Sequence, residues 1–122
     1  GKLLMGGTLG SGYANSILRF NSIGGVDNSF NEYGCNETVK SLLVLSNNSI
    51  FLGFDPNTNL PTEYRYLNYI NSTGIEDTTF HLDFTKASVQ CLVSIDDNTI
   101  LAGGNFTLNN INYCTIRLKK TQ

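Results

Sequence analysis

Residues 87–106, ASVQCLVSIDDNTILAGGNF, contain two β-strand patterns joined by a polar turn. Side chains two residues apart share one face of a strand. One face of the first strand is therefore expected to carry Val89, Cys91, Val93 and Ile95. The sequence DDNT supplies the turn, and the return strand, ILA, is expected to end at the glycine pair that follows it. The stretch predicts an antiparallel hairpin.

The same pattern occurs earlier in the chain, in residues 38–54, TVKSLLVLSNNSIFLGF, and its second half opens the chain as GKLLMGG. Like residues recur at a separation of 50: Gly24 and Gly74, Asp27 and Asp77, Phe30 and Phe80, Val39 and Val89, Leu42 and Leu92, Ile50 and Ile100. Repeats of about 20–50 residues are typical of solenoids, propellers and arrays. We therefore divide this single module, residues 1–122, into a partial first cycle (1–37), a second cycle (38–87) and a third, incomplete cycle (88–122).

The strand expected at residues 39–45, VKSLLVL, is apolar on both faces in its middle. A sheet with one face in water would alternate strictly between apolar and polar side chains. We therefore expect sheets that are covered on both sides, as the blades of a β-propeller are. Further strands are expected at residues 2–5, 16–20, 49–52, 64–70, 100–102 and 114–118. Since no window shows helical periodicity, the predicted fold class is all-β, with antiparallel β-sheet repeats of about 50 residues.

The composition favours one domain and excludes several classes of partner. The chain has 122 residues, of which 15% are charged, against ~25% in typical domains. Its net charge is −2, and Lys119 and Lys120 form its single basic run, so we expect no nucleic-acid partner. No apolar run approaches the ~20 residues of a membrane-spanning helix, so we expect no membrane span.

Few residues in the sequence are suited to catalysis or metal binding. The three cysteines, Cys35, Cys91 and Cys114, do not have the spacing of a zinc site, and His81 is the single histidine. We therefore expect no metal, no cofactor and no enzymatic activity.

The repeated charged residues are expected to have structural roles. Asp27 and Asp77 lie in G-x-x-D-x-[ST]-F segments, where each carboxylate is expected to accept backbone N–H bonds. The acidic pair at residues 96–97 is expected to shape a turn. Arg19 and Arg117 recur at one position of the pattern, where we expect bonds to backbone carbonyls or to an aspartate between blades.

A candidate ligand surface is formed by Tyr64, Tyr66 and Tyr69, beside a longer loop. Sugars stack on aromatic rings, so these residues are the place where a surface glycan would bind. The alternative is ordinary packing of aromatic side chains in a strand.

Several sequence blocks resemble the delta-60 repeat, whose consensus resembles D-G-K-I-L-V-G-G-x-F, I-A-R-L-N and D-G-x-x-D-x-x-F. The matching blocks are GKLLMGG at 1–7, ILRFN at 17–21, GGVDNSF at 24–30, NTILAGGNF at 98–106 and IRL at 116–118. The middle copy departs from the consensus, because GF replaces the double glycine and YI replaces Arg-Leu. The resemblance covers nearly the whole chain.

The resemblance implies a β-propeller-type repeat of bacterial surface proteins and of phage tail or virion proteins. It implies a non-catalytic structural module for protein–protein or surface attachment, located in a virion, outside the cell or at the cell surface. The alternative is a carbohydrate-binding, lectin-like module. Because a closed propeller has about 4–8 blades, three arrangements stay open: part of a longer array, a homo-oligomeric ring, or an open stack covered by other protein subunits.

Overall fold

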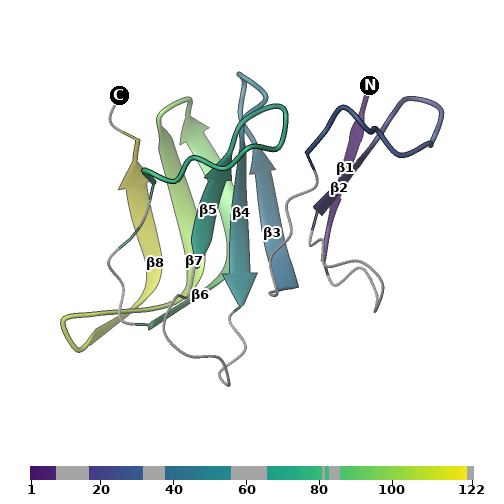
Figure 1. Cartoon of the computed structure of the whole chain (residues 1–122). Helices are drawn as coiled ribbons and strands as arrows, with labels where there is room; N and C mark the ends of the chain where they lie inside the picture. The colour runs from purple at the N-terminus through teal and green to yellow at the C-terminus, as the bar shows by residue number, and fades with distance from the viewer. Residues whose placement is uncertain (8–16, 32–37, 56–65, 81, 83–85, 121–122) are drawn as a thin grey trace.

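The computed structural model describes residues 1–7, 17–31, 38–55, 66–80, 82 and 86–120. The strands are β1 (Leu3–Gly6), β2 (Ile17–Phe20), β3 (Thr38–Val44), β4 (Ile50–Asp55), β5 (Leu67–Ile70), β6 (Lys86–Asp96), β7 (Thr99–Leu108) and β8 (Ile111–Lys119). They form three separate antiparallel sheets (Figure 1): β1–β2, the first sheet; β3–β4–β5, the middle sheet; and β6–β7–β8, the last sheet. The predicted all-β class is confirmed.

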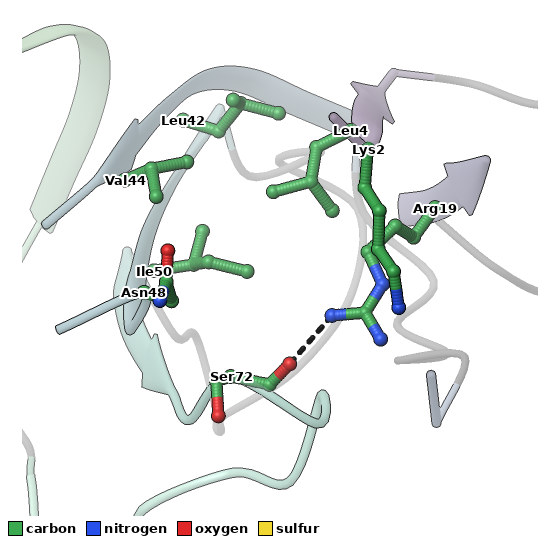
Figure 2. A pocket seen from close by; sticks show the side chains of 8 residues that line it. All are labelled: Lys2, Leu4, Arg19, Leu42, Val44, Asn48, Ile50 and Ser72. Carbon is green, nitrogen blue, oxygen red and sulfur yellow. Dashed lines mark hydrogen bonds between the residues drawn. The ribbon is translucent and has the colours of Figure 1, made fainter. Parts of the chain in front are cut away.

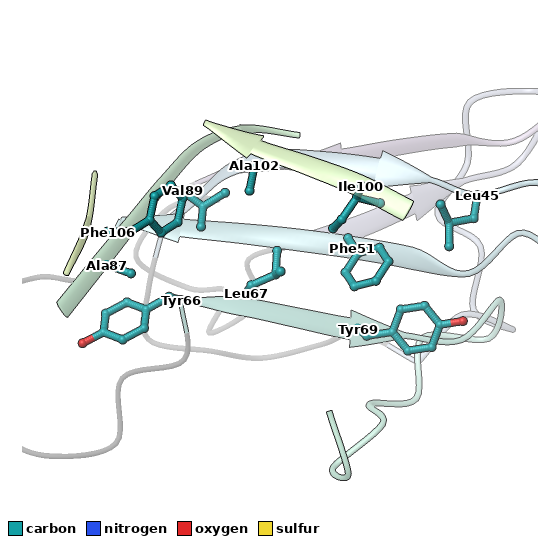
Figure 3. Packing of buried hydrophobic residues seen from close by; sticks show 10 residues of the cluster. All are labelled: Leu45, Phe51, Tyr66, Leu67, Tyr69, Ala87, Val89, Ile100, Ala102 and Phe106. Atoms are coloured by element: carbon teal, nitrogen blue, oxygen red, sulfur yellow. The ribbon is translucent and has the colours of Figure 1, made fainter. Parts of the chain in front are cut away.

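The middle sheet is buried on both faces because a sheet packs against each of them. One face meets the first sheet in a cluster formed by Ile17, Phe30, Val39, Ile50, Leu52, Phe54 and Ile70. The other face meets the last sheet in a cluster (Figure 3) formed by Leu45, Phe51, Tyr66, Leu67, Tyr69, Ala87, Val89, Ile100, Ala102 and Phe106. Alternate residues of the strand β4, IFLGFD, enter opposite clusters, as the period of two requires.

A β-bulge interrupts the first strand of each three-stranded sheet. The register of β3 shifts between Val39 and Ser41, and that of β6 shifts fifty residues later, between Val89 and Cys91. A bulge adds one unpaired residue to its strand and so changes which residues beyond it face the core.

The bulge in β6 makes one expectation wrong. Val89 is buried, whereas Val93 and Ile95, which were expected on its face, are 56% and 53% exposed. Cys91 is exposed with them. The expected cover on both faces is therefore found for the middle sheet, but the outer face of the last sheet is open.

The glycines do not end β4 and β7 as expected. β4 runs through Gly53 to Asp55, and β7 runs through Gly103 and Gly104 to Leu108. A Cβ on Gly53 would lie 2.5 Å from Val89 Cγ1. The absence of a side chain at this position therefore allows the middle and last sheets to pack closely together. Only β1 ends at its glycine, Gly6.

The last hairpin is longer than the sequence suggests. β8 begins at Ile111, after a two-residue turn in which Asn109 and Asn110 have φ of 50° and 63°. Positive φ at both central residues gives a turn whose twist matches that of the flanking strands. β7 and β8 therefore stay paired to their ends, Leu108 with Ile111.

Candidate functional site

A groove of about 630 Å³ lies between the first and middle sheets (Figure 2). Its walls are formed by Lys2, Leu4, Arg19, Leu42, Val44, Asn48, Ile50 and Ser72. Leu42 and Val44 of β3 and Ile50 of β4 line one side of it, and Lys2, Leu4 and Arg19 lie on the other side. The groove is therefore suited to an apolar segment with polar groups at its margin.

Arg19 connects the two sheets at this groove. Its Nε donates to Asp27 Oδ2 at 2.8 Å, and its Nη1 donates to the carbonyl of Ser72 at 2.6 Å. The guanidinium also lies 4.5 Å from the centroid of the buried Phe30 ring. The expectation that this arginine bonds an aspartate and a backbone carbonyl is confirmed.

Asp27 is the anionic centre of the same network. Its Oδ2 lies 2.8 Å from Lys2 Nζ as well as 2.8 Å from Arg19 Nε. Hydrogen bonds from the side chains of Lys2 and then Ser29 hold the pKa of Asp27 well below its ordinary value. Desolvation opposes them, and weaker contributions from the Ser29 backbone and Arg19 lower the pKa further. A carboxylate that stays ionised and is bonded on all sides is a structural anchor and a poor proton acceptor.

Asp77 and Asp96 also have the turn roles that were expected, whereas Asp97 bonds to another sheet. Asp77 Oδ1 accepts the backbone N–H of Thr79 at 3.0 Å, and hydrogen bonds from Thr79 lower the pKa of Asp77. In the turn between β6 and β7, Asp96 Oδ1 accepts the backbone N–H of Asn98 at 2.8 Å. Asp97 accepts the hydroxyl of Ser46, 2.6 Å away in the corresponding turn of the middle sheet.

Two of the three tyrosines of the candidate ligand surface are packed inside the chain. Tyr66 and Tyr69 are 7% and 6% exposed, and Tyr64 lies outside the described residues. The Tyr69 ring lies 4.8 Å from that of Phe51, and Lys120 Nζ lies 3.5 Å from its centroid. This is the strand packing given as the alternative. Glycan binding stays a prediction, and the placement of these two rings does not favour it.

The outer face of the last sheet is a feature that the sequence analysis missed. Cys91 pairs with Gly103 and Val93 pairs with Leu101, so these four residues share one face. Val93 is more than half exposed, and so is Ile95 at the end of the same strand. The sequence signal was present in CLVSI, but sheets covered on both sides were expected, so an exposed apolar face at this strand was not predicted.

The first sheet has an open face of the same kind. Leu4 packs against the middle sheet, whereas Leu3 and Met5, which alternate with it, are 65% and 42% exposed. The stack of three sheets thus ends at both sides in exposed apolar side chains.

The remaining candidates form no reactive cluster within the described residues. Cys91 and Cys114 are free and exposed, whereas Cys35 and His81 lie outside the described residues. In the described ranges no three His, Cys, Asp or Glu side chains are placed to hold a metal ion. No helix in that part of the chain is long and apolar enough to cross a membrane.

Comparison with known proteins gives no relative. The chain matches no protein-family model, no curated protein and no solved structure.

Proposed function

We propose that the chain is a non-catalytic structural module that mediates protein–protein assembly or attachment to a surface. The observation that carries this proposal is the open outer face of the last sheet, where Cys91, Val93, Ile95 and Leu101 leave apolar surface at the end of a stack. On the middle sheet, the corresponding face is covered by its neighbour. Exposed contiguous apolar surface is typical of an interaction site.

The setting we propose is a virion or phage tail, with a bacterial surface protein as the alternative. The delta-60 resemblance supports it, and so does the packing of three antiparallel sheets one against the next. Both three-stranded sheets have the same strand order, and their bulges fall fifty residues apart. Each sheet covers one face of the next, as in an array of repeats.

The thiol of Cys91 provides a test of assembly. This exposed thiol lies on the open face, opposite Gly103. We expect a maleimide to modify Cys91 quickly in the dilute purified chain and at least tenfold more slowly in the native assembly isolated from its source. Peptide mapping by mass spectrometry measures both rates.

Cys114 is the internal control in the same experiment. It neighbours Thr115, which pairs with Gly103, so alternation directs Cys114 to the other face of β8. It is also exposed, and its rate is expected to change less. Equal modification of Cys91 in the two samples would contradict an assembly role for this face.

A further inference from the structure

Four N-x-[ST] motifs occur in the sequence, and they begin at Asn36, Asn47, Asn71 and Asn105. This motif is the acceptor for N-linked glycans, which are joined to the side-chain amide of its asparagine. The motif at Asn36 lies outside the described residues. The other three differ in what surrounds the amide and the hydroxyl of the residue two positions later.

The motif at Asn105 lies inside a paired strand. Asn105 pairs with Ser88 on one side of β7, and Thr107 pairs with Asn112 on the other. The Thr107 hydroxyl donates to Asn112 Oδ1 at 2.8 Å. Phe106, between them, is 1% exposed. The last sheet would have to open before this motif could enter the active site of a transferase.

The motif at Asn47 has its hydroxyl residue buried. Asn47 is exposed in the turn between β3 and β4, but Ser49, which supplies the hydroxyl, is only 7% exposed. The backbone of Ser49 is also bonded at both ends, because its N–H donates to Asn47 Oδ1 at 3.0 Å and its carbonyl accepts the N–H of Leu45 at 2.8 Å. This motif presents its asparagine without its serine.

The motif at Asn71 has all three of its residues exposed. Asn71, Ser72 and Thr73 lie in the turn that follows β5. Asn71 Oδ1 accepts the backbone N–H groups of Thr73 at 3.0 Å and of Ile75 at 2.9 Å, and it also accepts the Thr73 hydroxyl at 2.8 Å. These three bonds all end at the amide oxygen, and none of them uses the amide nitrogen, Nδ2.

The bond from the Thr73 hydroxyl has a chemical consequence for Asn71. An amide nitrogen is a weak nucleophile because its lone pair is delocalised toward the carbonyl oxygen. When Nδ2 gives up a proton, negative charge collects on Oδ1, where the hydroxyl and the two N–H groups stabilise it. The turn therefore favours the form of this side chain in which Nδ2 can attack carbon.

We propose that Asn71 is an N-glycosylation site. The donor is a glycan linked through its anomeric carbon to a lipid pyrophosphate and supplied by an oligosaccharyltransferase. Nδ2 attacks the anomeric carbon, the bond from this carbon to the pyrophosphate oxygen breaks, and the lipid pyrophosphate leaves with the electron pair. One proton of Nδ2 passes to a base of the transferase. The site lies after β5 of the middle sheet, so the proposal goes beyond the assembly function and does not rest on it.

Asn21 provides a matched control fifty positions earlier. Its Oδ1 accepts the backbone N–H groups of Ile23 at 3.1 Å and of Gly25 at 3.0 Å, the same pair of backbone bonds that Asn71 makes. Isoleucine at position 23 has no hydroxyl, and it is 91% exposed. Ile23→Thr therefore adds the missing group at a position where a substitution disturbs no packing.

The test is mass spectrometry of the peptides that contain the motifs. One sample is the protein isolated from its source. The other is the folded chain, purified from a host without N-glycosylation and then incubated with an oligosaccharyltransferase and a lipid pyrophosphate-linked glycan. We expect a glycan on Asn71 in both samples, and none on Asn47 or Asn105.

Variants of the chain separate the role of the hydroxyl from that of the turn. Thr73→Ser is expected to keep the glycan, whereas Thr73→Val is expected to lose it. Asn71→Asp keeps an oxygen acceptor for the turn but has no Nδ2, and it is expected to carry no glycan. Ile23→Thr is expected to gain a glycan on Asn21. The three altered positions are exposed, and melting temperatures close to that of the parent show that the variants fold.

An unmodified Asn71 in either sample would overturn the proposal, and so would a glycan that persists in Thr73→Val. Equal modification of Asn47, Asn71 and Asn105 would show that the motif alone is recognised, and it would overturn selection by the folded turn. None of these results changes the expected protection of Cys91 in the native assembly, so the assembly function is tested separately.

Discussion

Gly53 lies directly against Val89 across the interface between the middle and last sheets. A Cβ on Gly53 would lie 2.5 Å from Val89 Cγ1 and 2.9 Å from Val89 Cβ. Gly6 has the same relationship to Val39 in the other interface, where a Cβ would lie 2.8 Å from Val39 Cγ1. Both valines are at least 95% buried. In each interface, a glycine on one sheet leaves the space that a valine side chain of the neighbouring sheet fills.

We expect Gly53→Ala to destabilise the chain. The added methyl group would overlap Val89, which is 1% exposed, so a buried side chain would have to shift. Overpacking of a core costs about 1–3 kcal/mol. Urea unfolding of the variant and the parent measures the difference. The control is Gly103→Ala, where the new Cβ would meet only Cys91 Sγ, at 2.6 Å on an exposed face, so the loss is expected to be smaller.

Gly74→Ala is expected to cost more stability than Gly24→Ala. The two glycines have nearly the same positive φ, 88° and 87°, so an alanine is similarly strained at either position. A Cβ on Gly74 would also collide with the carbonyl of Asn31, whereas a Cβ on Gly24 would meet no atom within 4 Å. Each variant's loss of unfolding free energy is measured relative to the parent chain, and the difference between the two losses gives the cost of the contact with Asn31. Equal losses would show that this contact is easily relaxed.

Ser41→Ala is expected to raise stability by about 1 kcal/mol. Ser41 Oγ is buried and has no hydrogen-bond partner in the described part of the chain. The same oxygen lies close to Gly53, since a Cβ on that glycine would be 2.5 Å from Ser41 Oγ. An unsatisfied buried hydroxyl costs about 1–3 kcal/mol, and alanine removes it without a large cavity. Thermal unfolding checks the sign, and a lower melting temperature would contradict the expectation.

Arg19→Lys is expected to lower the unfolding free energy by about 1 kcal/mol, the net contribution of a typical hydrogen bond. Lysine keeps the charge, but it cannot bond Asp27 and the Ser72 carbonyl at the same time with the planar fork of arginine. The matched control is Arg117→Lys, because Arg117 is exposed on β8. If both variants lose equal stability, the bridge between the sheets is not the cause.

Acid is expected to weaken the network of Asp27. Its pKa is lower in the folded chain than its ordinary value of 3.8, so the unfolded chain binds the proton more readily. The contribution to stability is therefore complete above that value and is lost as pH falls through the folded pKa. Unfolding of the parent and of Asp27→Asn, measured from pH 7 downward, should show a stability difference that shrinks in acid. A difference independent of pH would assign the effect to packing.

The regular features of the fold could be predicted from the sequence because they depend on local patterns. Each observed strand overlaps an expected one, although β7 and β8 run longer than expected. The β-bulges of β3 and β6 lie fifty positions apart, and so do two glycines with positive φ, Gly24 and Gly74. The turn roles of Asp27 and Asp77 also follow locally, since a short carboxylate reaches the backbone two residues on. The bond from Arg19 to an aspartate was expected from the recurrence of arginine at one position.

Other features depended on long-range packing, and the sequence did not reveal them. The face that Val93 and Ile95 occupy was wrongly predicted. A bulge adds one unpaired residue to the strand, so the alternation of side chains between the two faces does not continue across it. Gly53 was expected to end a strand. The glycine instead leaves room for Val89, which lies 36 positions away in the sequence, so no local pattern could reveal this contact.

The sequence by itself determined that the chain forms antiparallel strands, since alternation and turn residues act over a few positions. Only the tertiary structure decided which faces are covered, because burial depends on the sheet that lies next. It placed Tyr66 and Tyr69 in the core and left the outer face of the last sheet open. The same strand pattern is buried in one sheet and exposed in another, and the difference is the presence of a neighbour.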